Sequence, residues 1–388
     1  MKQSFWTRDL ALALLGYFFL FLSVTLFYLF PVFLDSFHPS KSRVGLIMGI
    51  HSVTAILVRP FFGRMVDERG GRKAAILGTL LMIAVVPFFH LVDGAGAMPL
   101  ALRALMGAGW GIGMTATMAI CSDLAPLDRM AHSIGIIGVA GIVASAVGPM
   151  LAEQLADSYG FGVIFNTSLA LLSGALICLL ATRGIPRADH AGGRGGTVRL
   201  ARYSLVTLSI IGSMAVVHGA VRGAVVNFIA LFGMDADLGR VGPFFLAFSA
   251  AAILTRLGMG DISDRYGRKQ VILPAGLLVS LNLFWLSQAQ SVEVFVLNGF
   301  IAGLGQGLIF PALSTYIIDF LGRENKGLAL ALYLSLFDVG MGLGSPVFGW
   351  VSDQVGYRSM YMAAGAFLLI TTFVFSVQAP RAPKTDSR

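Results

Sequence analysis

The sequence predicts an all-α membrane protein in which twelve transmembrane helices form two pseudo-symmetric six-helix bundles. The 388 residues are 56% hydrophobic and only 12% charged, with a mean hydropathy of +0.80. In a typical soluble domain, about a quarter of the residues are charged. Twelve stretches, each long and apolar enough to cross a bilayer, follow one another along the chain. A charged motif in the first half recurs in the second half, so we expect a six-helix unit that occurs twice.

The individual spans follow from the length that a helix needs to cross the hydrocarbon core, about 20 mostly apolar residues. The first apolar run reaches Leu34 without a small-residue cleavage site, so we expect an uncleaved first helix rather than a signal peptide. The twelve expected spans are residues 10–34, 44–66, 74–93, 98–122, 131–153, 163–182, 203–232, 240–262, 271–289, 293–319, 327–350 and 358–378.

One long connection divides the chain into two predicted domains. Residues 184–202 are rich in Gly and Arg, which is typical of a flexible linker. This linker separates an N-terminal bundle, residues 1–183, from a C-terminal bundle, residues 203–380, and residues 381–388 form a tail. Most of the 28 lysines and arginines fall on the side of the N-terminus. The positive-inside rule therefore places both termini and the linker in the cytoplasm, and the protein in the cytoplasmic (inner) membrane.

Composition excludes several other classes of function. The net charge is +8, and in a membrane protein the basic residues gather in cytoplasmic loops and near anionic lipid headgroups. This charge therefore does not indicate nucleic-acid binding. Cys121 and Cys178 lie in or beside apolar segments and show no disulfide or metal-ligand spacing. The sequence contains no G-x-S-x-G, H-E-x-x-H or Gly-rich nucleotide motif. We expect neither an enzyme nor a resident cofactor, and no metal.

The charged motif defines the repeat. RPFFGRMVDERGGRK (59–73) and RLGMGDISDRYGRK (256–269) align 197 residues apart, and DSYGF (157–161) matches DQVGY (353–357). Because these anchors keep nearly one spacing, we expect two parallel repeats with a substrate site at their interface near the bilayer midplane. The same alignment pairs MGAGWG, residues 106–111, with AGLGQG, residues 302–307.

The second copy of the motif resembles the loop between helices two and three of major facilitator superfamily transporters, roughly G-x-x-x-D-R-x-G-R-R/K. The first copy is looser, with Glu68 and Gly71 at positions that are usually basic. The resemblance covers nearly the whole chain. The residues that carry it in the second copy are Gly260, Asp264, Arg265, Gly267, Arg268 and Lys269.

Two further motifs extend this resemblance. Helix four matches a family motif at Arg103, Gly107 and Gly109. Helix one, with FLSVTLFYLFPVFL, looks like the bacterial efflux-permease branch. Helix five is similar to the proton-antiporter signature, which favours export. It retains Gly135, Gly148 and Pro149 but carries Ala144, Ala152 and Glu153 where the signature has glycines.

The resemblance implies that the charged loops are a conformational latch. In a facilitator fold, Asp67 would lie near the N-terminus of helix eleven and Asp264 near that of helix five, where a helix carries partial positive charge. The basic residues that follow would pair with Asp123 or Asp319. The alternative is that the loops only anchor the helices by the positive-inside rule. This alternative explains the Arg and Lys residues but not the paired Asp and Gly positions. The expected latch residues are Arg59, Gly63, Asp67, Gly70, Arg72, Lys73, Asp123, Arg256, Gly260, Asp264, Arg265, Gly267, Arg268 and Asp319.

Ionisable residues inside spans are candidates for contact with substrate or protons. The family motif implies such a role for Arg103, with snorkelling to the headgroups as its alternative. His218 and Arg222 lie four residues apart, on one face of helix seven, where they would form a basic patch facing the cavity. The alternative is that Arg222 snorkels outward. Asp338 is a mid-membrane carboxylate that either carries a proton or forms a structural pair. The remaining candidates are His51, which packing alone would equally explain, and the hydrogen-bonding residues Tyr28, Gln306 and Tyr333.

These residues predict the kind of substrate. Two arginines and a histidine suit a small molecule with a carboxylate or phosphate, so we expect an anionic or zwitterionic substrate. The leading hypothesis is a proton-coupled exporter that works by alternating access. The alternative is a proton-coupled symporter that imports a sugar, organic acid or amino acid. One twelve-helix chain forms a complete pathway, so we expect a monomer.

Overall fold

The computed structural model describes residues 7–69, 71–124, 130–183, 205–259, 262–321 and 326–380. Within these ranges every regular element is a helix, and ten helices are long and apolar enough to cross a membrane. The tenth of these contains Gly356 at φ 80°, which divides it into two, and a shorter apolar helix covers residues 242–258. The all-α class and the twelve predicted spans are therefore confirmed.

The first half of the chain begins with a span built from three pieces. Pro31 lies at the start of the third piece and Pro87 at the start of η2. Because proline lacks a backbone donor, the helix tightens into 3-10 turns at both places. The elements are α1 (Arg8–Thr25), η1 (Leu26–Leu29), α2 (Phe30–Asp35), α3 (Lys41–Arg69), α4 (Gly71–Val85), η2 (Val86–Leu91), α5 (Ala97–Asp123), α6 (Met130–Tyr159) and α7 (Phe161–Ala181).

The second half repeats this plan down to single backbone angles. Gly160, at φ 79° and ψ 170°, separates α6 from α7, and Gly356, at φ 80° and ψ 170°, divides the last helix at the equivalent position. Glycine alone adopts this conformation readily, so the predicted repeat extends to the backbone. The elements are α8 (Leu205–Asp235), α9 (Gly242–Met259), α10 (Ile262–Tyr266), α11 (Arg268–Ser287), α12 (Val292–Leu321) and α13 (Lys326–Gln378).

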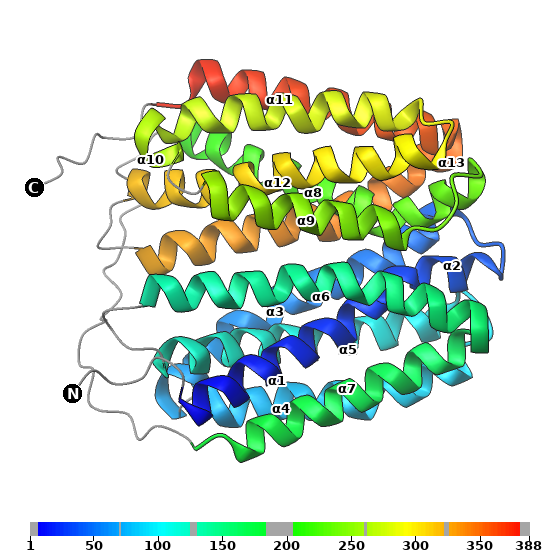
Figure 1. Ribbon diagram of the computed structural model, residues 1–388, viewed down its shortest axis with the longest axis vertical. Coiled ribbons are helices and arrows are strands. Elements are labelled where there is room, and N and C mark those ends of the chain that lie inside the picture. Colours follow the sequence, from blue (N-terminus) through cyan, green and yellow to red (C-terminus); the bar gives the residue numbers. More distant parts are fainter. Residues whose placement is uncertain are drawn as a thin grey trace, which may run out of the picture. The chain divides into compact units, whose positions relative to one another are not determined.

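The chain forms two compact units. Unit 1 comprises Met1–Pro39, Leu46–Ala188 and Arg240–Leu246, and its α4 packs along α5 while α1 packs against α6 and α7 (Figure 1). Unit 2 comprises Ser40–Gly45, Asp189–Gly239 and Ala247–Arg388, and its α8 packs along α13 while α11 packs along α12. The units follow the two sequence halves except at residues 40–45 and 240–246, each of which belongs to the unit of the other half.

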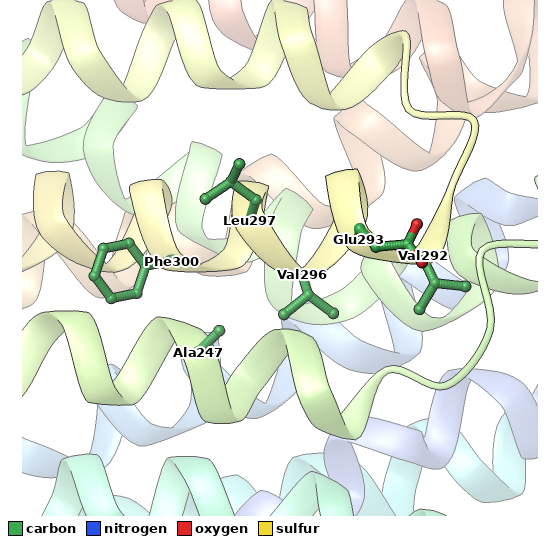
Figure 2. Close-up of a pocket in the computed structure, with 6 residues that line it drawn as sticks. All are labelled: Ala247, Val292, Glu293, Val296, Leu297 and Phe300. Atoms are coloured by element: carbon green, nitrogen blue, oxygen red, sulfur yellow. The ribbon is translucent and has the colours of Figure 1, made fainter.

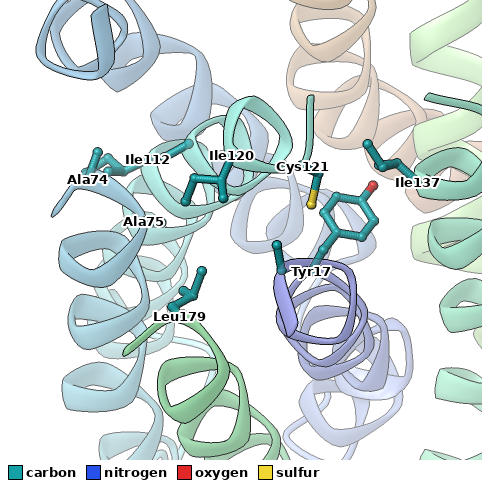
Figure 3. Close-up of a cluster of buried hydrophobic side chains, with 10 residues drawn as sticks. Tyr17, Ala74, Ala75, Ile112, Ile120, Cys121, Ile137 and Leu179 are labelled. Atoms are coloured by element: carbon teal, nitrogen blue, oxygen red, sulfur yellow. The ribbon is translucent and has the colours of Figure 1, made fainter. Parts of the chain in front are cut away.

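The core of unit 1 combines small and branched side chains. Small residues on α4 and α5 let these helices approach closely, which is how membrane helices gain packing energy without a hydrophobic driving force. Figure 3 shows this cluster, in which α1, α4, α5, α6 and α7 all take part. Its buried members are Ala13, Tyr17, Ala74, Ala75, Ile112, Ala116, Ile120, Cys121, Ile137 and Leu179.

Glycines create the same helix crossing in both units. A Cβ on Gly107 of α5 would collide with the backbone of His51 in α3, and a Cβ on Gly303 of α12 would collide with that of Phe248 in α9. Gly107 and Gly303 are equivalent in the repeat, as are His51 and Phe248. The crossing therefore brings two equivalent residues, one polar and one aromatic, to the interior of their units.

Candidate functional site

Arg103 is a buried cation of unit 1. Its side chain is 4% exposed, its Nε has no hydrogen-bond partner, and its Nη1 lies 3.8 Å from the sulfur of Met106. The guanidinium lies 5.7 Å from the centre of the Phe27 ring. In the part of the chain that the structure describes, no carboxylate pairs with it. A buried charge without a counter-charge costs several kcal/mol, about as much as a buried ion pair loses when one partner is removed.

His51 and Tyr28 surround this arginine. The imidazole of His51 is 7% exposed and interacts with the backbone and the charge of Arg103, and its Nδ1 has no hydrogen-bond partner. Tyr28 interacts electrostatically with Arg103, and its ring packs against Phe245 with centroids 5.5 Å apart. Three candidates that the sequence named separately, on three different helices, thus form one basic cluster.

Unit 2 contains a second basic cluster, on α8. His218 is 1% exposed, and its Nε2 shares a hydrogen bond of 2.7 Å with Oε1 of Gln306 from α12. One turn further along, the guanidinium of Arg222 lies 4.4 Å from the centre of the Phe248 ring. The sequence grouped His218 with Arg222 by their spacing, but it did not predict the partner of either side chain.

Aromatic rings of α12 and α13 line the same region of unit 2. Tyr333 is fully buried, and its hydroxyl has no hydrogen-bond partner. Its ring lies 5.2 Å from that of Phe310 and 6.3 Å from that of Phe337, and Phe337 in turn lies 5.2 Å from the ring of His218. Asp338 follows Phe337 and interacts electrostatically with Tyr333. His218 and Tyr333 therefore both lie beside Phe337. Gln306 joins this group through its hydrogen bond to His218, and Asp338 through its interaction with Tyr333.

The antiporter-like motif, which lies in α6, is a packing site. A Cβ on Gly148 of α6 would collide with the side chain of Thr25 on α1. The hydroxyl of Thr25 donates to the carbonyl of Ala144, at 2.9 Å. Gly135, at the other end of the motif, has nothing within 4 Å of a Cβ position. Pro149 follows Gly148 inside α6. The Gly-Pro core thus lets α1 approach α6, whereas Gly135 serves no contact.

The expected latch residues lie at one end of the helices, and several bind within their own unit. Arg268 pairs with Asp319 at 3.1 Å and donates to Ser263. Arg72 donates to the carbonyls of Leu179 and Leu180, at 3.2 Å and 2.6 Å, where α7 ends.

The remaining latch residues differ in their exposure and in how much of their surroundings the structure describes. Lys73 and Arg265 are exposed, and Gly267 has φ 97°. Gly70 and Gly260 lie outside the described residues, as do the side chains at Gly63, Asp67 and Asp264. The expected pairing of Asp67 and Asp264 with helix ends therefore stays a prediction. Arg59 lies in α3, Asp123 ends α5, and Arg256 lies in the last turn of α9.

A groove on unit 2 is distinct from these clusters. It lies between α9 and α12 and is apolar apart from one carboxylate, Glu293 (Figure 2). A binding site for a polar molecule needs several convergent polar groups, so this groove does not suit the predicted substrate. The lining residues are Ala247, Val292, Glu293, Val296, Leu297 and Phe300.

Sequence reasoning missed two carboxylates as functional candidates. Glu153 accepts hydrogen bonds from the first backbone N–H groups of α9, and Asp353 accepts them from the first N–H groups of α3. Both partners lie far away in the sequence. The only available signal was that Glu153 replaces a glycine of the helix-five signature.

Comparison with known proteins agrees with this architecture. The family model described as Major Facilitator Superfamily matches residues 13–253 and 211–388. The multidrug resistance protein MdtG of Dickeya zeae (strain Ech586) is 23% identical and is matched over 95% of this chain and 93% of its own. The crystal structure of the nucleoside transporter NupG superposes with a TM-score of 0.82 at 13% identity, over 95% of this chain and 99% of that one. A bacterial homologue of the human lysosomal transporter Spinster gives a TM-score of 0.80 at 15% identity, over 97% of each chain.

Proposed function

The chain belongs to the Major Facilitator Superfamily, and we propose that this multi-pass membrane transporter exports a small organic anion or zwitterion in exchange for protons. Membership of the family makes the protein a transporter of small molecules rather than an enzyme. The direction of transport, the coupling ion and the charge of the substrate are the parts that we add.

The observation that carries the proposal is the buried Arg103 beside His51. No carboxylate pairs with this arginine in the described part of the chain, so the folded protein keeps a cation whose partner it does not supply. A carboxylate or phosphate of the substrate would supply the counter-charge, in the bidentate geometry that a guanidinium favours. Snorkelling does not account for Arg103, because its side chain is 4% exposed.

Basic and aromatic residues of unit 2 also support an anionic substrate. Arg222 and His218 add two basic groups on one face of α8, and Phe248 and Phe337 add aromatic surface next to them. A substrate with an acidic group and an apolar or aromatic body would use both features. Asp338 is the acidic group of this cluster, and we infer that it either carries the coupling proton or binds the amine of a zwitterion.

Export is supported by sequence alone. MdtG, which is similar over nearly its full length, is named a multidrug resistance protein. The Gly-Pro core of the antiporter signature is retained at Gly148 and Pro149. Neither observation depends on the charge of the substrate, so direction and substrate class need separate tests.

Ligand-dependent thermal stability tests the substrate class. Purified protein is screened against organic anions, zwitterions and lipophilic cations, and we expect stabilisation by anions or zwitterions that is lost in Arg103→Ala. Arg240→Ala is the matched control, because this arginine pairs with Asp157 at the surface, where its side chain is 64% exposed. Stabilisation by lipophilic cations alone would contradict the proposal.

Counterflow in proteoliposomes tests direction and coupling. A ligand found in the thermal screen is loaded on one side, and a pH gradient of either sign is imposed. Antiport predicts that substrate leaves the compartment that the protons enter, so an inward proton gradient drives substrate out. Movement of substrate together with protons would identify the symport alternative.

A further inference from the structure

Glu153 holds the first turn of α9. Its Oε1 accepts a hydrogen bond from the Val241 backbone N–H at 2.8 Å, and its Oε2 accepts one from the Gly242 N–H at 2.9 Å. The first N–H groups of a helix have no partner inside the helix and carry partial positive charge. A carboxylate that accepts two of them makes a strong, charge-assisted cap.

Asp353 holds the first turn of α3 in the same way. Its Oδ1 accepts from the Lys41 N–H at 2.6 Å, and its Oδ2 accepts from the Ser42 N–H at 2.9 Å. The ammonium of Lys41 lies 4.0 Å from the centre of the Tyr357 ring. A Cβ on Gly349 would collide with the Lys41 carbonyl, so the helices approach closely here.

The two capped helix starts lie in the two segments that belong to the unit of the other sequence half. Residues 240–246 belong to unit 1, with Glu153, although the rest of α9 belongs to unit 2. Residues 40–45 belong to unit 2, with Asp353, although the rest of α3 belongs to unit 1. Each carboxylate therefore attaches the start of one helix to a unit that does not contain the rest of that helix.

The repeat shows that the two caps are related but not identical. Asp157, not Glu153, is the equivalent of Asp353, and it pairs instead with the side chain of Arg240 at 2.6 Å. Glu153 lies four residues earlier, one helical turn along α6, at a position where the antiporter signature has glycine. The first half of the chain thus performs the capping with a residue that departs from the antiporter signature.

We propose that Glu153 and Asp353 are a pair of gating carboxylates, whose caps on α9 and α3 release together during the transport cycle. The predicted topology places both caps at the outer ends of their helices, opposite the charged loops. The inference rests on membership of the transporter family and on these contacts, and it is independent of the direction of transport and of the substrate.

The physical reason for release is that alternating access moves one repeat against the other. A helix whose first turn belongs to one unit and whose remainder belongs to the other cannot keep both attachments when the units move. Carboxylate caps suit a contact that must break, because water satisfies both the carboxylate and the freed N–H groups after release. An apolar contact would leave its surface exposed to water instead.

Two buried valines at equivalent positions provide matched reporters. Val44 is 1% exposed on α3 and Val241 is 3% exposed just before α9, 197 residues later. Val44→Cys and Val241→Cys are made separately in full-length protein in which Cys121 and Cys178 are replaced by serine. The rate of labelling by a membrane-impermeant maleimide added outside is measured for each reporter in the parent, Glu153→Gln and Asp353→Asn.

We expect each amide variant to raise the labelling rate of both reporters about tenfold, since loss of a charge-assisted hydrogen bond corresponds to about one order of magnitude or more in an equilibrium. Asp157→Asn is the control, since it removes the same charge from a surface ion pair, and it should leave both rates unchanged. Circular dichroism and thermal melting of each variant show whether the fold is retained.

The outcomes are distinct. Unchanged rates in both amide variants would overturn the gate. A variant that exposes only the reporter on its own cap would overturn the joint release. A rise of equal size in Asp157→Asn would show a general effect of outer charge and would also overturn the proposal. Retained stabilisation by anionic ligands in Glu153→Gln separates this test from that of the proposed function.

Discussion

Arg72 and Lys269 occupy equivalent positions in the two repeats, and each donates to backbone carbonyls where the last helix of its own unit ends. Arg72 binds the carbonyls of Leu179 and Leu180, and Lys269 binds that of Ala379 at 2.5 Å. The last carbonyls of a helix lack internal partners and carry partial negative charge, so a cation there is favourable. The charged loops therefore fasten helices within each unit, in addition to any role between units.

Removing these cations is predicted to destabilise the protein. We expect Arg72→Ala and Lys269→Ala each to lower the free energy of unfolding by about 1 kcal/mol, the size of a favourable charge at a helix end. The measurement is thermal melting in detergent. Lys73→Ala is the control, since this neighbouring side chain is exposed. Equal melting of all three variants would contradict the capping role.

Two glycines of α6, Gly135 and Gly148, are predicted to differ sharply in their tolerance of a methyl group. Gly148→Ala drives a Cβ into Thr25 and should cost about 1–3 kcal/mol of stability, the usual cost of overpacking a core. Gly135→Ala is the matched control on the same helix, since nothing lies within 4 Å of its Cβ position. There we expect no loss, or a gain of up to about 1 kcal/mol from helix propensity. A destabilised Gly135→Ala would refute this account.

The sequence predicted the features of the fold that depend on local composition. Apolar length located the twelve spans, and the match of DSYGF to DQVGY helped to predict the repeat. The structure has equivalent turns in these two segments, at Gly160 and Gly356. The sequence did not predict that residues 40–45 and 240–246 pack with the opposite half. The caps on these segments come from Glu153 and Asp353, whose partners lie 88 and more than 300 residues away.

The candidate site was predicted as a set of residues but not as contacts. Arg103, His218 and Arg222 were identified because an ionisable side chain is costly, and therefore rare, inside a membrane helix. Helical spacing alone does not predict that Gln306 binds His218, or that Phe248 lies beneath Arg222. Such pairings depend on helix crossings, which glycines such as Gly303 determine by close approach.

The hydrogen bond between His218 and Gln306 is predicted to be modest in energy and important for function. Double-mutant cycles with His218→Ala and Gln306→Ala should give a coupling of about 1 kcal/mol in thermal stability, as for other hydrogen bonds between membrane helices. Ligand stabilisation should fall in both single variants. Ser213→Ala on α8 is the control, since its hydroxyl donates only to the carbonyl of Ile210 on the same helix. Additive effects, with no coupling, would show that the two side chains act independently.

The two charged loops, which the positive-inside rule predicts to be cytoplasmic, are predicted to bias the transporter toward one of two states. If Asp67 and Asp264 each hold the end of a helix from the opposite repeat, then Asp67→Asn and Asp264→Asn weaken a charge–dipole attraction and shift the resting population toward the inward-open state. The second copy fits the family pattern more closely, so we expect the larger shift in Asp264→Asn.

Cysteine labelling in inverted membrane vesicles measures this shift, with Gln306→Cys as the reporter. Asp9→Asn is the control, because Asp9 also lies at the end that is predicted to be cytoplasmic, and it accepts a hydrogen bond of 3.1 Å from the Arg183 backbone. We expect faster labelling in the two latch variants and an unchanged rate in Asp9→Asn. If labelling is the same in all three, the loops serve as charged anchors and as caps of their own units, and the attraction between repeats at that side comes from other contacts.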